Sequence, residues 1–166
     1  MHDLILIGLP ASGKTSVGRA LARRLDMPFY DCDEAVETAA GQPVSAIFPQ
    51  HGETFFRDME SKMLEDLCSR ERCVIATGGG AVLRQENSLL LRRSGVVFWL
   101  DRPLEDIMST NFQSGRPLLA EGRQALERLA AARRGLYASC ACHRIPESLL
   151  EKAVEDIENI WRGENI

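Results

Sequence analysis

The first sixteen residues constrain the fold more than any other part of the chain. A fully apolar run at residues 4–7 is followed directly by Gly8-Leu-Pro-Ala-Ser-Gly-Lys-Thr15. A run this short and this apolar is typical of a strand buried on both faces of a parallel sheet. Apolar residues then recur every four positions at Val17, Leu21 and Leu25, which indicates a helix with one buried face. The chain therefore opens with a buried strand, a glycine-containing loop and a helix.

This unit fits the P-loop pattern G-x-x-x-x-G-K-[ST] in full. The glycines let backbone N–H groups turn inward around an anion, and the helix that begins at Lys14 adds a partial positive charge. Lys14 is expected to reach the β- and γ-phosphates, and the Thr15 hydroxyl to bind Mg²⁺. An ordinary glycine turn is the alternative, but the flanking strand and helix argue against it. We predict that ATP, or a closely related nucleotide, binds with Mg²⁺ at Ala11, Ser12, Gly13, Lys14, Thr15 and Ser16.

Buried strands alternate with helical segments along the rest of the chain. Further strands are expected at residues 28–30, 73–76, 96–100 and 143–145. Helices are expected at residues 44–48, closed by Pro49, and at 53–70, 86–93, 104–108, 124–141 and 148–161. This alternation predicts an α/β, three-layer P-loop NTPase fold, with a five-stranded parallel sheet and helices on both faces. We see no repeat or linker, so residues 1–166 are expected to form a single domain.

Composition excludes several other classes of protein. The chain is 45% hydrophobic and 27% charged, as soluble globular proteins are. Its net charge of -4 gives no reason to expect nucleic-acid binding, which usually needs a basic imbalance. No segment approaches the ~20 apolar residues that a membrane span requires. Five cysteines without metal-ligand spacing or a signal peptide favour reduced thiols in the cytoplasm.

Ligands of such sheets bind beyond the carboxyl ends of the strands, where the second strand ends at Asp31. In an extended chain Asp31 and Asp33 would point to the same side, so one could hold the metal and the other accept a proton. A helix N-cap is the alternative, and the spacing leaves both open. Asp101, after the strand at 96–100, could also be a metal carboxylate, but Asp101-Arg-Pro fits a helix N-cap, which we favour.

Three further groups at this edge have both a functional and an ordinary interpretation. Arg57 and Glu60 form an i, i+3 pair that is usually surface decoration, but neighbouring aromatic residues make an inward guanidinium plausible. Gly78-Gly79-Gly80 follows a strand, so a ligand could touch its backbone N–H groups, or it could be a plain loop. Arg133 lies on the long helix at 124–141, where solvated charges are the ordinary case.

Taken together, these motifs resemble those of shikimate kinases over nearly the whole chain. The matching pieces are Gly8 to Thr15, Asp31-Cys-Asp33, Ile47-Phe48, Gly52-Glu53 to Phe56-Arg57 with Glu60, Thr77 to Gly80, Arg116-Pro-Leu-Leu119 and Arg133-x-x-Leu136-Tyr137. The resemblance implies phosphorylation of the 3-hydroxyl of shikimate by ATP, in aromatic amino acid biosynthesis. It also implies a monomer.

The resemblance further implies a role for each acceptor-side residue. Asp33 would bind the acceptor hydroxyls and act as the base, and Asp31 would hold Mg²⁺ through water. Arg57 and Arg133 would bind the shikimate carboxylate, with Glu60 orienting Arg57. The backbone of Gly78, Gly79 and Gly80, Gly79 above all, would bind a ring hydroxyl. Residues 31–62 would form the acceptor-binding segment.

The resemblance also implies a mobile lid at about residues 109–122, from which Arg116 would reach the transferring phosphate. The sequence departs from the family where an arginine commonly stacks on adenine, because Ser109-Thr-Asn111 stands there. We expect Arg144 to supply the adenine wall instead. Gly135 also replaces a usual proline, and Ala11 a frequent glycine.

Two other functions compete with this prediction. A gluconate or nucleoside-monophosphate kinase would share the fold, but neither predicts Asp31, Asp33, Arg57, the triple glycine and Arg133 together. A catalytically silent paralogue would bind nucleotide only, and it would be expected to lose Lys14, Asp33 or an arginine of the anion site. All of these are present.

Overall fold

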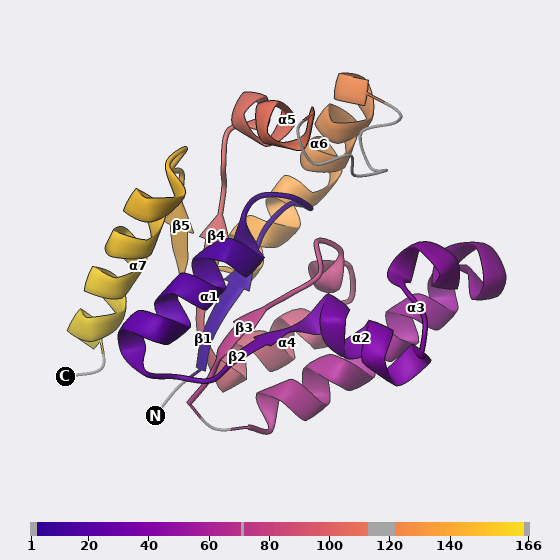
Figure 1. The fold of residues 1–166 in the computed structure, drawn as a ribbon, viewed down its shortest axis with the longest axis horizontal. Helices are drawn as coiled ribbons and strands as arrows, with labels where there is room; N and C mark the ends of the chain where they lie inside the picture. Colours follow the sequence, from indigo (N-terminus) through magenta and orange to yellow (C-terminus); the bar gives the residue numbers. More distant parts are fainter. Residues whose placement is uncertain (1–2, 71, 113–121, 165–166) are drawn as a thin grey trace.

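A computed structural model describes residues 3–70, 72–112 and 122–164, with the side chains of 111 and 112 excepted (Figure 1). In this part of the chain five strands form one sheet: β1 (Asp3–Ile7), β2 (Phe29–Asp31), β3 (Val74–Ala76), β4 (Gly95–Leu100) and β5 (His143–Ile145). The strand order is β2-β3-β1-β4-β5, and every neighbouring pair is parallel. The predicted five-stranded parallel sheet is confirmed.

Helices join the strands and cover both faces of the sheet (Figure 1). They are α1 (Lys14–Leu25), α2 (Cys32–Ala40), α3 (Val44–Cys68), the 3₁₀ turn η1 (Ala81–Leu83), α4 (Gln85–Ser94), α5 (Leu104–Phe112), α6 (Gly122–Cys140) and α7 (Leu150–Glu164). The helix after the phosphate loop begins at Lys14, as predicted.

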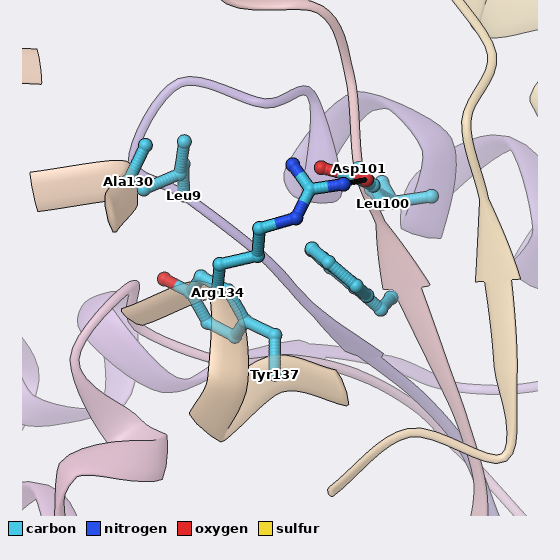
Figure 2. Close-up of a pocket in the computed structure, with 7 residues that line it drawn as sticks. Leu9, Leu100, Asp101, Ala130, Arg134 and Tyr137 are labelled. Atoms are coloured by element: carbon cyan, nitrogen blue, oxygen red, sulfur yellow. Dashed lines mark ion pairs between the residues drawn. The ribbon is translucent and has the colours of Figure 1, made fainter. Parts of the chain in front are cut away.

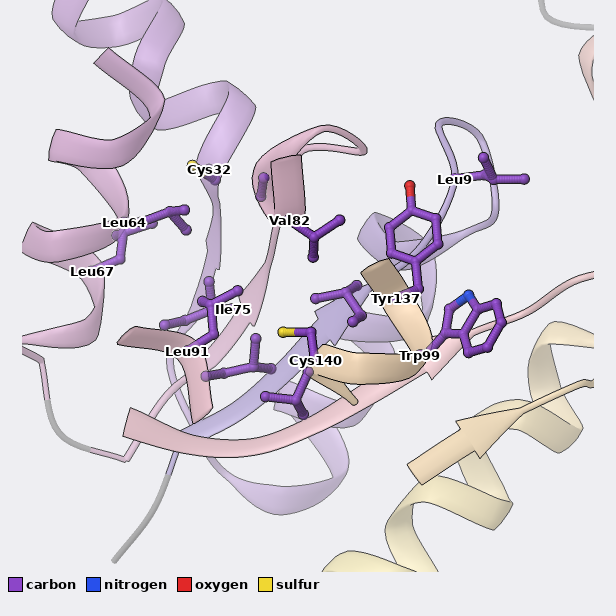
Figure 3. Close-up of a cluster of buried hydrophobic side chains, with 14 of the residues drawn as sticks. Leu9, Cys32, Leu64, Leu67, Ile75, Val82, Leu91, Trp99, Tyr137 and Cys140 are labelled. Carbon is purple, nitrogen blue, oxygen red and sulfur yellow. The ribbon is translucent and has the colours of Figure 1, made fainter. Parts of the chain in front are cut away.

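Alternate residues of β1 face two separate cores, because successive side chains of a strand point to opposite faces. Leu4 and Leu6 pack with α1 and α7, whereas Ile5 and Ile7 pack with α3, α4 and α6 (Figure 3). All four are fully buried, and each contributes about 1.5–3 kcal/mol of transfer free energy. Helices on both faces thus hold β1 in place, and with it the loop that follows.

Three elements differ most from the predictions. Residues 32–40 form α2, which was not predicted. The helix expected to close at Pro49 instead continues to Gly52, where φ is 82° and ψ is 170°. Proline fixes φ near the helical value and removes one donor, whereas glycine can adopt the positive φ that breaks the helix. Helix α5 extends to Phe112, so the first four residues of the predicted lid are helical.

Candidate active site

The phosphate loop connects β1 to α1 through two glycines with positive φ, Gly8 at 147° and Gly13 at 97°. A Cβ on Gly8 would lie 2.7 Å from the Leu100 carbonyl oxygen, and one on Gly13 would lie 2.6 Å from the Leu150 side chain. Neither position therefore accepts a side chain. The loop is held between the end of β4 and the start of α7.

Lys14 is folded back onto its own loop. Its ammonium donates to the carbonyl oxygens of Gly8 at 2.9 Å and Leu9 at 2.7 Å, and lies 3.5 Å from Ser12 Oγ. The residue is only 7% exposed. A phosphate bound in the loop would replace the two carbonyls as the acceptor of these hydrogen bonds.

Asp31 serves two purposes with its two oxygens. Its Oδ1 caps α2 by accepting from the backbone N–H groups of Asp33 at 3.0 Å and Glu34 at 3.4 Å. Its Oδ2 accepts the Thr15 hydroxyl at 2.7 Å. The helix cap, one of the two alternatives that the sequence left open, is therefore present, and the same carboxylate also binds the phosphate loop through Thr15. The extended arrangement assumed for Asp31 and Asp33 is wrong, because Asp33 lies in the first turn of α2.

The donor set at Thr15 and Asp31 fits Mg²⁺, which prefers hydroxyl, carboxylate and phosphate oxygens and keeps several waters. Within the residues that the structure describes, no cluster of three or more His, Cys, Asp or Glu could hold a metal. A cation that takes one or two protein ligands and completes its shell with phosphates suits this arrangement better than one that needs a protein cage.

Asp33 and Glu60 approach Gly78 from two helices. A Cβ on Gly78 would lie 2.4 Å from Glu60 Oε1 and 2.8 Å from Asp33 Oδ1. Burial, with a smaller contribution from the charge of Asp31, raises the pKa of Asp33 to about 6, and the charge of Lys14 opposes the shift. Two carboxyl groups therefore share a partly desolvated space beside the glycine loop.

Arg57 is directed inward, which decides between the two interpretations of this residue. Its Nη1 donates to Glu60 Oε2 at 2.6 Å, and its side chain is 12% exposed. Glu60 is fully buried, and burial raises its pKa against the opposing charges of Arg57, Arg133 and Arg84. The second oxygen of Glu60, Oε1, accepts no hydrogen bond from the described residues.

The glycine loop at residues 78–80 lies against both the phosphate loop and the side chains of α2 and α3. A Cβ on Gly79 would lie 2.6 Å from Pro10 in the phosphate loop, and one on Gly80 would lie 2.4 Å from the Arg57 guanidinium. On its other side, the Gly79 carbonyl accepts the Tyr137 hydroxyl of α6 at 2.5 Å. The loop thus brings the phosphate loop, α3 and α6 together.

Asp101 lies in a different cluster at the ends of β4 and β5 (Figure 2). Its carboxylate accepts from Arg144 at 2.6 Å and lies 3.5 Å from Arg134. Both guanidinium groups lie over the Trp99 ring, at 5.7 Å for Arg134 and 5.5 Å for Arg144. The predicted N-cap role is wrong, because Pro103 is the residue before α5.

Comparisons with known proteins agree on one family. The family model described as "Shikimate kinase" matches residues 10–161. The shikimate kinase of Burkholderia thailandensis is 45% identical over 142 residues, covering 84% of this chain and 77% of the relative. The chain belongs to the shikimate kinase family. The shikimate kinase of Symbiobacterium thermophilum is 44% identical over an alignment of 171 positions that covers 98% of both chains.

Solved shikimate kinases have the same fold. The structure of the Acinetobacter baumannii enzyme in complex with shikimate has a TM-score of 0.93 at 32% identity, and the match covers 100% of this chain and 96% of that one. The Aquifex aeolicus enzyme has a TM-score of 0.81 at 32% identity, with 98% of both chains covered. The predicted fold class is confirmed, and the predicted enzyme class is that of the family to which the chain belongs.

Most residues predicted for a shikimate kinase site meet at the edge of the sheet. The structure brings together the phosphate loop, Asp31, Asp33, Arg57, Glu60 and the glycine loop. Arg133 lies on α6 near these groups, and its charge opposes the rise that burial causes in the pKa of Glu60. Arg116 lies outside the described residues. Arg144 pairs with Asp101, and its adenine role stays a prediction.

Sequence reasoning did not give Tyr137 a role, although the residue was part of the motif that begins at Arg133. The signal was its position four residues after Arg133, on the same face of a helix.

None of the helices in the described part of the chain has the length and apolar character that a membrane span needs.

Proposed function

We propose that this site transfers the γ-phosphoryl group of ATP to the 3-hydroxyl of shikimate. One observation carries the proposal. The glycine loop at 78–80 packs on Pro10 of the phosphate loop on one side, and on Asp33, Glu60 and Arg57 on the other. A donor site for phosphates and a second site with carboxylate and guanidinium groups therefore share one wall, as direct transfer between two bound substrates requires.

The donor side is assigned to residues 11–16. The backbone N–H groups of Ala11, Ser12 and Gly13 and the N-terminus of α1 would surround the phosphates, and Lys14 would neutralise the charge on them. Thr15 and Asp31 would hold Mg²⁺, which when bound neutralises phosphate charge. Ser16 would contribute its backbone N–H in the first turn of α1.

The acceptor side is assigned to Asp33, Arg57, Arg133 and the backbone at Gly79. Asp33 would take the proton of the attacking hydroxyl, and a pKa of about 6 suits a base that must be ionised near neutral pH. Arg57 and Arg133 would bind the carboxylate of shikimate, since guanidinium groups match a planar carboxylate in two-point contacts. The neighbouring backbone of Gly78 and Gly80 would complete the wall.

The remaining assignments rest on the resemblance alone. They are Arg116 as a ligand of the transferring phosphate, residues 109–122 as a lid, residues 31–62 as the acceptor-binding segment and Arg144 as the adenine wall. A monomer is proposed on the same ground, whereas a single kinase domain and a cytoplasmic location are proposed from the lack of a repeat or linker and from the cysteine pattern.

A panel of acceptors tests the proposal. ADP release from ATP and Mg²⁺ should depend on shikimate and should be at background with gluconate or AMP. Equal release with either of these compounds would sink the assignment in favour of the sugar-acid or nucleotide kinases. Release at background with every acceptor, despite nucleotide binding, would favour a silent paralogue.

A further inference from the structure

Tyr137 links two elements that border the acceptor site. Its hydroxyl donates to the Gly79 carbonyl at 2.5 Å, from a side chain that is 2% exposed. The ring packs against Trp99 with 5.8 Å between centroids, and belongs to the buried cluster beneath the site (Figure 3). A single hydroxyl thus joins α6 to the middle of the glycine loop.

The Tyr137 hydroxyl lies near the two arginines that are proposed to bind the carboxylate of the acceptor. Arg133 lies one helical turn before Tyr137 on the same face of α6. Burial raises the pKa of Tyr137 to about 12 against the opposing effects of Arg133 and then Arg57. The phenol therefore stays a hydrogen-bond donor at neutral pH, and both guanidinium groups act on it electrostatically.

We propose that the Tyr137 hydroxyl positions Arg133 for the carboxylate of the acceptor. By binding the Gly79 carbonyl it fixes the rotation and depth of α6, and so the distance between Arg133 and the glycine loop. Two-point contacts between a guanidinium and a carboxylate depend strongly on that geometry. The inference rests on the proposed role of Arg133 in binding shikimate.

The C-terminal end of α6, just beyond Tyr137, offers a matched control. Arg92 of α4 donates to the carbonyl oxygens of Ser139 at 3.0 Å and Cys140 at 3.3 Å. This contact also holds α6 against a neighbouring helix. It lies after Tyr137 in the chain, whereas Arg133 lies before it. A variant at Arg92 therefore measures the effect of weakening the attachment of α6 while the hydrogen bond from Tyr137 to Gly79 is kept.

Tyr137→Phe tests the inference, because it keeps the buried ring and removes only the hydroxyl. The dissociation constant of shikimate, measured by calorimetry without nucleotide, and the KM for shikimate should both rise roughly three- to tenfold. The kcat and the KM for ATP should change by less than about twofold. Arg92→Ala should lower the melting temperature and leave shikimate binding unchanged. Unchanged affinity in Tyr137→Phe, or an equal loss in Arg92→Ala, would overturn the inference.

A double-mutant cycle separates this inference from the proposed function. If Tyr137 acts through Arg133, adding Tyr137→Phe to Arg133→Ala should weaken shikimate binding by less than about twofold further. Full additivity would overturn the positioning role, even if both single variants bind weakly. Unchanged binding in Arg133→Ala alone would instead overturn the proposed carboxylate contact, and the inference with it.

Discussion

The phosphate loop builds its binding surface from backbone groups, whereas the acceptor side builds its surface from charged side chains on α2, α3 and α6. In the loop, Lys14 is bonded to the Gly8 and Leu9 carbonyls. On the acceptor side, burial raises the pKa values of Asp33 and Glu60, and Glu60 Oε1 is buried without a hydrogen bond from the described residues. The charge of Lys14 is therefore stabilised by hydrogen bonds within the loop, whereas the carboxylates of the acceptor side are destabilised by burial.

This difference leads to opposite expectations for stability and activity. Removing the charge of Asp33 should stabilise the protein while it destroys function, a trade-off that is common at active sites. Removing the charge of Lys14 should lower both stability and activity. The stability and activity of variants on the two sides therefore test whether this difference exists.

Asp33→Asn should have the largest effect on turnover. Loss of a general base lowers kcat by about 10²–10⁴-fold, because the hydroxyl proton then has no positioned acceptor. The KM for ATP should stay within about twofold of the wild-type value, since the donor side is built separately. Steady-state kinetics with both substrates varied checks this, and unchanged turnover would rule out the base role.

Lys14→Met should lower kcat by about 10²–10³-fold, the range for losing one preorganised charge that stabilises a transition state. It should also destabilise the free protein by about 1–3 kcal/mol, because two buried carbonyls lose their donor. Denaturant unfolding without nucleotide measures the second effect. A stabilised Lys14→Met protein would break the comparison between the two sides.

Gly78→Ala should damage the acceptor side selectively. The new Cβ would lie within 3 Å of oxygens of both Glu60 and Asp33, and such overpacking costs about 1–3 kcal/mol. Shikimate binding should weaken while nucleotide binding is kept, as separate titrations would reveal.

Gly135→Ala is the matched control for Gly78→Ala. A Cβ on Gly135 would meet nothing within 4 Å, and alanine favours the helix by about 0.5–1 kcal/mol. The control should therefore be as active and at least as stable as the wild type. Equal losses in the two variants would show that the space around Gly78 is not critical.

The pH dependence of stability gives the smallest and most specific test. Because the folded pKa of Asp33 is about 6 and its ordinary value is 3.8, the folded state binds this proton more tightly than the unfolded state. That contribution to stability is fully present below about pH 4 and is lost as pH rises through 6. Asp33→Asn should therefore gain about 1–3 kcal/mol over the wild type between pH 4 and pH 7, in metal-free and nucleotide-free protein. A difference that stays flat with pH would contradict the shift.

The donor side could be predicted from sequence because it is contiguous. Eight residues give the motif, and the buried strand before them and the helix after them are required by the same pattern. The strands of the sheet were predicted for a similar reason, since short apolar runs between breakers need no knowledge of distant contacts.

The acceptor side could be predicted only in part, because its residues come from four separate segments. The rotation of α3 decides whether Arg57 points inward, and that depends on Glu60 being buried against the glycine loop. Helix α2 was missed because Asp31 was placed in an extended chain, although it also caps a helix. The role of Tyr137 depends on a contact 58 residues away in sequence, which no local pattern encodes.

The cluster around Trp99 gives the protein a built-in optical probe. The chain has two tryptophans, and Trp161 lies in α7 on the opposite face of the sheet. Trp99 contacts the Tyr137 ring and lies under two guanidinium groups, one of them on α6. In a Trp161→Phe background, indole emission would therefore come from Trp99 alone. Movements of α6 during binding could then be followed in stopped-flow experiments without any added label.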